Sequence, residues 1–370
     1  MIYRDFAGKQ VSVLGFGAMR FPTENGSVVE KEAIAMLRAA IDGGVNYIDT
    51  AYFYHGGVSE TIVGKALEDG YRAKTYVATK CPVWELKEPS DFEKLLDVQL
   101  GRLKMDYVDF YMFHGISSGA WKRIKEMGLI ERIENAKKAG KIGHIGFSFH
   151  DNYDALAEIL DGYDKWEFCQ IQLNYIDTEG QAGIRGLKKI EGMGIPVIIM
   201  EPLWGGKLAN PPVAVRKIFE ESGKSPVELA FDWLWAKPMP RNLIAISGMS
   251  TMKQVLENVE YAERAPETMD QELIKRAQDE FKKLKLIPCT GCGYCGCPNG
   301  VSISSNFDAY NQAHIDNRVE EGRGAYNAMT QWSGEKAQAP NCTSCGSCEE
   351  LCPQHIKISE EMPKVAKFFS

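Results

Sequence analysis

Short apolar runs alternate with longer amphipathic stretches through about the first 250 residues of this chain. The apolar runs have the length of buried strands, and the stretches between them, such as KEAIAMLRAAIDGG, carry apolar residues three and four positions apart. This alternation indicates β/α units and a parallel sheet. We expect an N-terminal hairpin and then strands near residues 13–18, 45–49, 76–80, 108–114, 145–149, 168–173, 197–200 and 243–247.

Eight β/α units in about 250 residues are the size of a closed (β/α)8 TIM barrel, whereas an open doubly wound sheet is usually shorter. A Rossmann dinucleotide site is not expected, because the chain contains no G-x-G-x-x-G and its nearest candidate, GFGAM, lacks the third glycine. The first part of the chain is therefore predicted to be an α/β barrel.

Polar residues end three consecutive expected strands. These residues are Asp49, Lys80 and His114, and Tyr54 follows the first strand in its loop. The carboxyl ends of parallel barrel strands hold the active sites of such folds. Taken singly, each residue has a structural interpretation, since Lys extends to solvent, Asp caps helices and His packs. Together they can move a proton: Lys80 would lower the pKa of Tyr54, Asp49 would orient Lys80, and His114 would donate to a carbonyl oxygen gaining charge.

Several classes of function are excluded by charge and hydropathy. A net charge of −7, with Lys and Arg scattered among acidic residues, argues against nucleic acid as a partner. No apolar run approaches the roughly 20 residues of a membrane span. The first residues lack the pattern of a secretory signal, so we expect a cytoplasmic protein.

The cysteines divide the chain into two parts. Cys81 and Cys169 stand alone in the first 288 residues and are interpreted as ordinary buried thiols, whereas the remaining cysteines lie between 289 and 352. We expect residues 1–285 to form the barrel and 286–370 to form a second domain, after a charged helical stretch that Pro288 closes.

The second cysteine group has the spacing of a ferredoxin run, in which three thiolates bind one [4Fe-4S] cubane and the fourth ligates the neighbouring cluster, and the first group keeps the triplet and the Cys-Pro pair of such a run. The first run has a shorter arm before Cys297 than the second has before Cys352. Structural zinc and disulfides are the alternatives, but zinc favours separated pairs and a cytoplasmic chain seldom keeps disulfides. The spacing predicts two clusters with crossed ligands, namely Cys289, Cys292, Cys295 and Cys352 for one, and Cys342, Cys345, Cys348 and Cys297 for the other.

The motifs NYIDTAYFY, VATK and DFYMFH resemble those of the aldo-keto reductases, and the likeness runs from about residue 10 to 262. The resemblance implies that Asp49, Tyr54, Lys80 and His114 form a catalytic tetrad with Tyr54 as the proton donor. It also implies hydride transfer between a nicotinamide cofactor, NADP or NAD, and a carbonyl or alcohol substrate.

Segments GFSFH, CQIQLNY, MEPLWGG and SGMSTMKQVLENV resemble the cofactor-binding parts of that family. Ser148 and Gln170 would hold the carboxamide, and Met200 would lie beneath the nicotinamide, where many members have an aromatic residue. The chain lacks the Lys-Ser pair and the Arg that many NADP-preferring members carry, so Lys253 remains as the cation and the choice of nucleotide stays open. The implied contacts are Ser148, Gln170, Met200, Pro202, Leu203, Gly248, Ser250, Gln254 and Asn258.

The stretch between the cysteine runs is amphipathic and helix-like, so the tail resembles a small α-helical ferredoxin-like domain. A subgroup of aldo-keto reductases carries a similar tail, which implies an electron relay and a possible redox protein partner. Two alternatives stay open: clusters with a structural role, and a nicotinamide-binding redox-sensing or regulatory subunit. We expect loops with Trp84 and Trp121 to shape a site for a small or medium apolar carbonyl or hydroxy compound.

Overall fold

The computed structural model describes the whole chain except residues 285, 290–294, 316–317 and 353. The described residues form two compact units. One consists of Met1–Leu203 with Val227–Met269, and the other of Trp204–Pro226 with Asp270–Ser370. The expected division of the sequence into residues 1–285 and 286–370 stays a prediction. None of the helices in the described ranges is long and apolar enough to cross a membrane.

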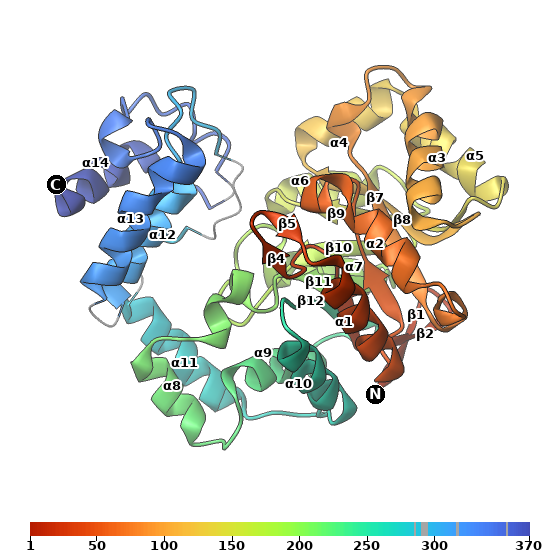
Figure 1. Ribbon diagram of the computed structural model, residues 1–370, viewed down its shortest axis with the longest axis horizontal. Coiled ribbons are helices and arrows are strands. Elements are labelled where there is room, and N and C mark those ends of the chain that lie inside the picture. Colours follow the sequence, from red (N-terminus) through yellow and green to blue (C-terminus); the bar gives the residue numbers. More distant parts are fainter. Residues whose placement is uncertain (285, 290–294, 316–317, 353) are drawn as a thin grey trace. The chain divides into compact units, whose positions relative to one another are not determined.

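The first unit is built on a closed barrel of eight parallel strands, which confirms the predicted fold class (Figure 1). Every expected strand is present, with ends within three residues of the prediction. Around the barrel the strands follow the order β10-β11-β12-β3-β6-β7-β8-β9. Their bounds are β3 (Leu14–Gly17), β6 (Tyr47–Asp49), β7 (Tyr76–Cys81), β8 (Val108–Ile116), β9 (Ile142–Phe149), β10 (Phe168–Gln172), β11 (Val197–Met200) and β12 (Leu243–Gly248).

Strand register explains why the polar residues meet. Asp49 in β6 pairs with Ala78 in β7, and Lys80 lies two residues beyond Ala78. In the same way Lys80 pairs with Met112 in β8, and His114 lies two residues beyond Met112. Because paired residues and alternate residues of a strand share one face of a sheet, all these side chains point to the barrel interior. From β6 to β7 and from β7 to β8, the polar residue therefore lies two positions nearer the carboxyl end of the barrel.

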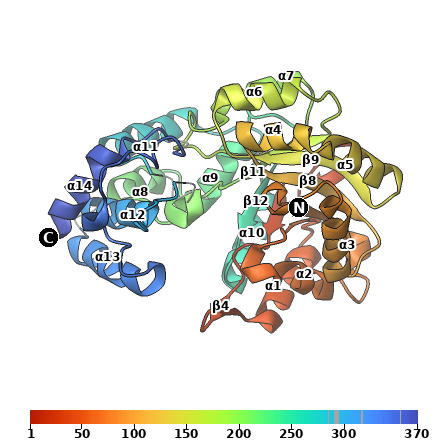
Figure 2. The same cartoon turned by 90° about the horizontal axis from the view of Figure 1, so that it is seen from above.

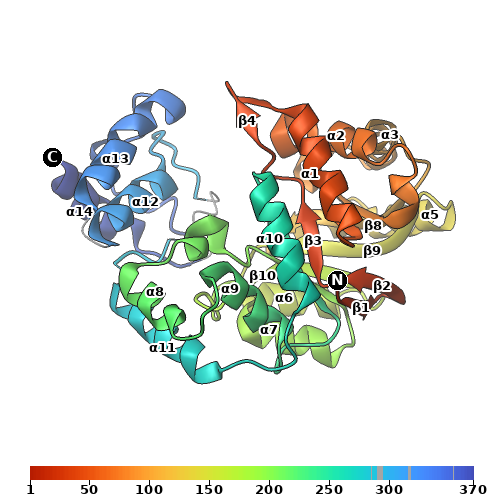
Figure 3. The same cartoon turned by 60° about the horizontal axis from the view of Figure 1, so that its bottom comes forward.

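Helices cover the outside of the barrel (Figure 3). On α1 the buried residues recur three and four positions apart, namely Ala33, Met36, Leu37, Ala40 and Ile41, so the helix buries one apolar stripe. The α-helices of this unit are α1 (Glu30–Asp42), α2 (Ser59–Ala66), α3 (Asp91–Leu103), α4 (Ser118–Glu126), α5 (Leu129–Lys138), α6 (Tyr153–Asp161), α7 (Gly183–Gly192), α9 (Pro226–Trp235) and α10 (Met252–Glu263). Short 3-10 helices are η1 (Tyr54–Gly57), η2 (Tyr71–Lys74) and η3 (Val83–Glu85).

An antiparallel hairpin precedes the barrel, as expected. Strand β1 (Tyr3–Phe6) pairs with β2 (Lys9–Ser12). Phe6 is fully buried and packs edge-on against Phe110, with the ring centroids 5.6 Å apart. The hairpin therefore adds an aromatic residue to the apolar cluster inside the barrel. A second small hairpin, β4 (Thr23–Glu24) with β5 (Ser27–Val28), follows the first barrel strand.

The second unit is helical, which agrees with the prediction for the tail (Figure 2). Its core contains Phe307, Ile358 and Met362 together with several cysteines. Gly322 allows α13 to approach α12, because a Cβ atom there would lie 2.5 Å from Cβ of Ala313. Its elements are η4 (Trp204–Ala209), α8 (Val213–Glu220), α11 (Gln271–Leu284), α12 (Ile303–His314), α13 (Val319–Ser333), η6 (Ala339–Asn341) and α14 (Ile358–Phe369).

Candidate active site

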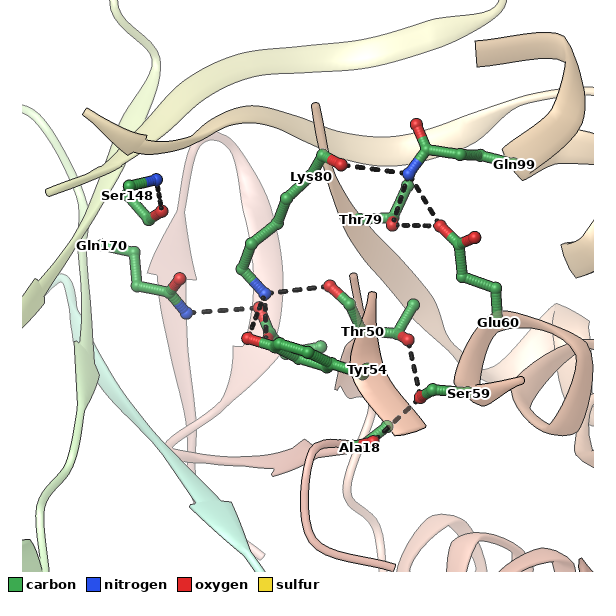
Figure 4. Close-up of polar contacts among 12 residues, drawn as sticks. Ala18, Thr50, Tyr54, Ser59, Glu60, Thr79, Lys80, Gln99, Ser148 and Gln170 are labelled. Carbon is green, nitrogen blue, oxygen red and sulfur yellow. Dashed lines mark hydrogen bonds and ion pairs between the residues drawn. The ribbon is translucent and has the colours of Figure 1, made fainter. Parts of the chain in front are cut away.

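Lys80 is the centre of a buried polar group at the carboxyl mouth of the barrel (Figure 4). Its Nζ donates to Oδ1 of Asp49 at 2.6 Å and to the carbonyl oxygen of Thr50 at 2.8 Å. The side chains of Lys80 and Asp49 are each 1% exposed, so their charges face one another with little water between them. Removing either partner would leave an unpaired buried charge.

Tyr54 approaches the same ammonium from the loop after β6. Its hydroxyl accepts a hydrogen bond from Lys80 Nζ at 3.2 Å, and Nζ lies 4.8 Å from the centre of the Tyr54 ring. The turn that follows Tyr54 has positive φ at His55, Gly56 and Gly57, and the two glycines adopt these angles without steric cost. The local sequence therefore turns the chain sharply after Tyr54. The Tyr54 hydroxyl lies beside the Lys80 ammonium.

His114 joins the group from β8. Its ring stands edge-on to Tyr54, with the ring centroids 6.1 Å apart, and lies 5.2 Å from the ring of Trp84. Within the described ranges, its buried Nδ1 has no hydrogen-bond partner. The structure thus brings together all four residues of the predicted tetrad, and their catalytic roles stay a prediction.

Burial decides the protonation of these groups. Burial, together with the charge of Asp49, raises the pKa of Tyr54 by more than Lys80 lowers it, so the hydroxyl keeps its proton at neutral pH. Burial also holds the pKa of His114 well below its usual value, and the charges of Lys80 and His150 act in the same direction. Burial alone would lower the pKa of Lys80, but Asp49 and Tyr54 outweigh it and raise that pKa. The expected lowering of the Tyr54 pKa by Lys80 is thus present but is overcome by desolvation.

Ser148 and Gln170, the residues expected at the carboxamide, lie side by side on β9 and β10. Both are 1% exposed. Gln170 Nε2 donates to Oδ2 of Asp49 at 3.2 Å, and Ser148 Oγ accepts from the backbone N–H of Gly115 at 2.7 Å. Their amide and hydroxyl groups can donate to and accept from a carboxamide, so this pair fits the group that the sequence assigned to it.

Met200 ends the next strand, and Pro202 and Leu203 lie in the loop that follows it. Met200 pairs in register with Gln172 and is partly buried against the barrel core. Pro202 is buried and Leu203 is half-buried in the loop that follows. The three residues therefore lie at the carboxyl end of β11, where a flat ring could pack on the Met200 thioether.

The segment expected to bind the adenosine phosphate follows β12. Ser250 donates its backbone N–H to Oε1 of Gln254 at 2.7 Å, and its hydroxyl donates to the carbonyl oxygen of Arg20 at 2.8 Å. Asn258 is buried and donates to Ser247 Oγ at 3.2 Å. Gly248 ends β12 and is exposed. The assigned residues therefore form one continuous corner at the start of α10.

Arg20 is a residue of this corner that the sequence did not indicate. Its side chain packs against Gly248, although it follows the first barrel strand, 230 positions before Ser250. The barrel closes by pairing β12 with β3, which brings the two segments together. The sequence could have indicated this contact through the predicted barrel, because a closed barrel of eight strands pairs its first strand with its last.

Exposed aromatic side chains lie beside His114. The rings of Phe53 and Trp84 are stacked at 6.1 Å and are 41% and 52% exposed. Trp121 is 1% exposed and packs on Trp166, so the expectation that it shapes the substrate site is wrong. Its helix, α4, turns it inward toward neighbouring helices.

Four of the predicted cluster ligands share one pocket in the second unit. Cys297, Cys342, Cys345 and Cys348 line it together, so Cys297 of the first run lies near three cysteines of the second, and its role as a ligand stays a prediction. Soft thiols are the donor type of a [4Fe-4S] cluster, although these four do not converge on one point in this structure. Among the residues with described positions, no three His, Cys, Asp or Glu side chains converge closely enough to hold a metal ion.

The other predicted ligand set is described only in part. Cys289 and Cys352 are buried in the core of the second unit, and Cys295 packs against that core. Cys292 and Pro353 lie outside the described residues. The two remaining cysteines are buried in the barrel, and burial raises the pKa of Cys81 to about 12, which fits an unreactive thiol.

Comparison with known proteins agrees with this geometry. Residues 13–279 match the aldo/keto reductase family, and residues 288–356 match the 4Fe-4S dicluster domain. L-galactose dehydrogenase of Arabidopsis thaliana is 29% identical over 75% of this chain and 93% of its own length. 6-dehydroglucose reductase of Novosphingobium aromaticivorans is 26% identical over 69% of this chain and 87% of its own length.

Solved structures show the same fold. The holo form of an aldo-keto reductase from Bacillus halodurans has a TM-score of 0.62 and 24% identity, over 75% of this chain and 96% of its own. An aldo-keto reductase from Klebsiella pneumoniae in complex with NADPH has a TM-score of 0.61 and 22% identity, over 76% and 96%. With the family match over most of the barrel, the chain belongs to the aldo-keto reductases, as an oxidoreductase with a C-terminal 4Fe-4S dicluster domain.

Proposed function

We propose that this protein transfers hydride between NADP or NAD and a carbonyl or alcohol substrate, with Asp49, Tyr54, Lys80 and His114 as the catalytic group. The observation that carries the proposal is Lys80, whose ammonium binds Asp49 at 2.6 Å and the Tyr54 hydroxyl at 3.2 Å. A buried ammonium paired on one side and touching a phenol on the other is suited to stabilise the phenolate that proton transfer would leave.

In the reductive direction the substrate carbonyl oxygen would lie between Tyr54 and His114. A nicotinamide bound at the barrel mouth would supply hydride for the carbonyl carbon. Tyr54 would give its proton to the oxygen, Lys80 would stabilise the resulting phenolate, and a proton from water would restore the hydroxyl. His114 is neutral because burial lowers its pKa, so it acts as a hydrogen-bond donor and not as an acid. One carbonyl, one hydride and one proton give one alcohol.

The nucleotide would bind across the barrel mouth. We assign the carboxamide to Ser148 and Gln170, which lie side by side on adjacent strands. The ring would pack by Met200, and the adenosine phosphate would lie at the start of α10. The full set of proposed contacts is Ser148, Gln170, Met200, Pro202, Leu203, Gly248, Ser250, Gln254 and Asn258.

The second unit would hold two [4Fe-4S] clusters that pass electrons to or from a redox protein partner. Support comes from the pocket that Cys297 shares with Cys342, Cys345 and Cys348. The second cluster would use Cys289, Cys292, Cys295 and Cys352. Thiolate ligands persist in a reducing compartment, which supports a cytoplasmic location.

Two observations bear on the substrate class: the exposed aromatic rings beside His114 and the names of two relatives. The stacked, exposed rings of Phe53 and Trp84 offer an apolar surface next to His114. Such rings pack on flat apolar compounds and on the C–H faces of sugars. Because two of the relatives are named for sugar conversions, sugars belong in the substrate panel beside apolar aldehydes and ketones.

The test follows deuterium from reduced nicotinamide labelled at C4 into the product. Anaerobically purified protein is incubated with the labelled cofactor and the panel, and products are analysed by mass spectrometry. Direct transfer predicts one deuterium on the former carbonyl carbon. Reduction without deuterium, driven by a reduced ferredoxin alone, would replace this proposal by cluster-delivered electrons. Tight cofactor binding with no turnover across the panel would favour a regulatory subunit.

A further inference from the structure

A second buried polar cluster lies directly behind Lys80 (Figure 4). Glu60 on α2 is fully buried, and its Oε1 accepts hydrogen bonds from Thr79 Oγ1 at 2.6 Å and Gln99 Nε2 at 2.7 Å. The same Gln99 amide donates to the backbone oxygen of Lys80 at 3.0 Å. One oxygen of Glu60 thus holds the strand segment that carries Lys80.

The other carboxylate oxygen faces the loop that carries Tyr54. Glu60 Oε2 pairs with Arg102 Nη1 at 3.2 Å. The same Nη1 donates to the carbonyl oxygen of Tyr52 at 3.2 Å, and the guanidinium lies 4.3 Å from the centre of the Tyr52 ring. Tyr52 stands two residues before Tyr54. Glu60 therefore connects the two segments whose side chains meet at Lys80 Nζ and Tyr54 OH.

We propose that Glu60 is a positioning residue, which, through Gln99 and Arg102, sets the separation of Lys80 Nζ from Tyr54 OH and so tunes proton transfer by Tyr54. This inference rests on the proposed roles of Lys80 and Tyr54. Glu60 touches neither the ammonium nor the phenol, and its influence passes through the backbone on both sides.

Hydrogen-bond chemistry explains why a carboxylate is needed. Its partners Thr79, Gln99 and Arg102 all donate, and a carboxylate accepts at both oxygens. An amide at position 60 would turn its NH2 group toward a donor on one side or the other, which leaves a buried group unsatisfied. The Gln99 amide cannot compensate by rotating, because its Nε2 also donates to the backbone oxygen of Lys80 at 3.0 Å, and a rotated amide would present its own oxygen to that acceptor.

The effect on Tyr54 has a definite sign. Lys80 lowers the pKa of Tyr54 against the larger effect of burial. If the connection of Glu60 to Gln99 or to Arg102 is lost and Lys80 Nζ moves away from the Tyr54 hydroxyl, the pKa of Tyr54 rises further. The phenol then becomes a weaker acid, and any limb of the pH profile that reports its ionisation moves to higher pH.

The experiment compares Glu60→Gln with Asp109→Asn in the full-length, cluster-loaded protein. Asp109 is a matched control: it is a buried carboxylate on β8 that pairs with Arg72 at 2.8 Å and accepts from Val77 N–H at 2.8 Å. It lies near the start of its strand, at the opposite end from His114. Arg102→Ala provides a milder second variant, because Arg102 is 28% exposed.

Four quantities are measured: the pH dependence of single-turnover hydride transfer, the cofactor dissociation constant, the thermal unfolding midpoint, and the phenolate absorbance of Tyr54. Phenolate absorbance, taken as the difference from the same variant carrying Tyr54→Phe, reports Tyr54 directly. Glu60→Gln should move the Tyr54 ionisation up by about one pH unit and slow transfer by about tenfold or more, while cofactor binding changes little. Arg102→Ala should act in the same direction by less. Asp109→Asn should lower the unfolding midpoint and leave the profile in place.

The inference is overturned if Glu60→Gln and Arg102→Ala lose stability as Asp109→Asn does but keep the wild-type Tyr54 ionisation. Should Glu60→Gln fail to fold, Arg102→Ala alone decides, since it breaks the connection from Glu60 to Tyr52 and keeps the hydrogen bonds of Glu60 with Thr79 and Gln99. If Tyr54→Phe in the otherwise unchanged protein has normal turnover, the proposed function fails, and that outcome is distinct from a failure of Glu60.

Discussion

The side-chain carbons of Arg20 pack over Gly248, so a Cβ atom added at Gly248 would lie 3.1 Å from both Cγ and Cδ of Arg20. Ser250, in the same corner, donates its hydroxyl to the Arg20 carbonyl oxygen. This contact adds a cation to a corner where the sequence had indicated only Lys253. Lys253 is 82% exposed and lies 3.7 Å from Glu257, so its charge is screened and partly paired.

Arg20 is therefore expected to carry most of any preference for the 2′-phosphate. Arg20→Ala should weaken NADPH binding by about tenfold relative to NADH, the scale of one hydrogen bond to a charged group, and Lys253→Ala should do less. Fluorescence titration of both nucleotides measures the ratio. Arg132→Ala, which removes an Arg paired with Glu93 on another helix, serves as the control. If the ratio of NADPH to NADH affinity stays the same in Arg20→Ala and Lys253→Ala, other residues bind the 2′-phosphate.

Tyr54→Phe should reduce carbonyl reduction by at least about a hundredfold, because a positioned proton donor is lost. Binding of the nicotinamide should stay nearly unchanged, which a titration checks in the same preparation. Tyr71→Phe is the matched control: its hydroxyl donates to Asp42 away from the site, and turnover should be kept. Wild-type turnover in Tyr54→Phe would remove Tyr54 from the mechanism.

His114 should stay neutral across the working pH range. Because burial depresses its pKa below the unfolded value of about 6.5, its neutral form favours the native state above that pH, and this contribution is lost as the pH falls. The single-turnover rate should accordingly show no inflection near the usual histidine value. An inflection there that disappears in His114→Gln would contradict the assignment.

Anaerobically purified protein should contain about eight iron and eight sulfide per chain. Cys297→Ala should alter the cluster of the pocket that it shares with Cys342, Cys345 and Cys348, seen as lost iron and a changed paramagnetic resonance spectrum. Cys352→Ala should alter the other cluster. Cys169→Ala, at a buried thiol in the barrel, should leave iron content as it is. If the iron content and the spectrum of Cys297→Ala are unchanged, this cluster has a ligand other than Cys297 at that position.

Much of the barrel was predictable because its signals are local. The strands lie within three residues of their expected positions, since a buried parallel strand needs an apolar run and each surrounding helix needs a 3.6-residue stripe. Asp49, Lys80 and His114 were recognisable because each follows such a run and parallel strands end at a common mouth. The thiol spacing likewise indicated clusters, because ligation constrains the number of residues between ligands.

What the tertiary structure decided depends on groups far apart in the sequence. The net direction of the Tyr54 pKa depends on how completely the surrounding chain excludes water, and spacing does not encode that balance. The contact of Arg20 with Gly248 exists because the barrel closes, and the burial of Trp121 follows from which face of α4 turns inward. In the sequence, nothing distinguishes Glu60 from an ordinary acidic residue of a helix. Only the packing of α2 and α3 against β7 gives it three donors and a connection to both Lys80 and Tyr54.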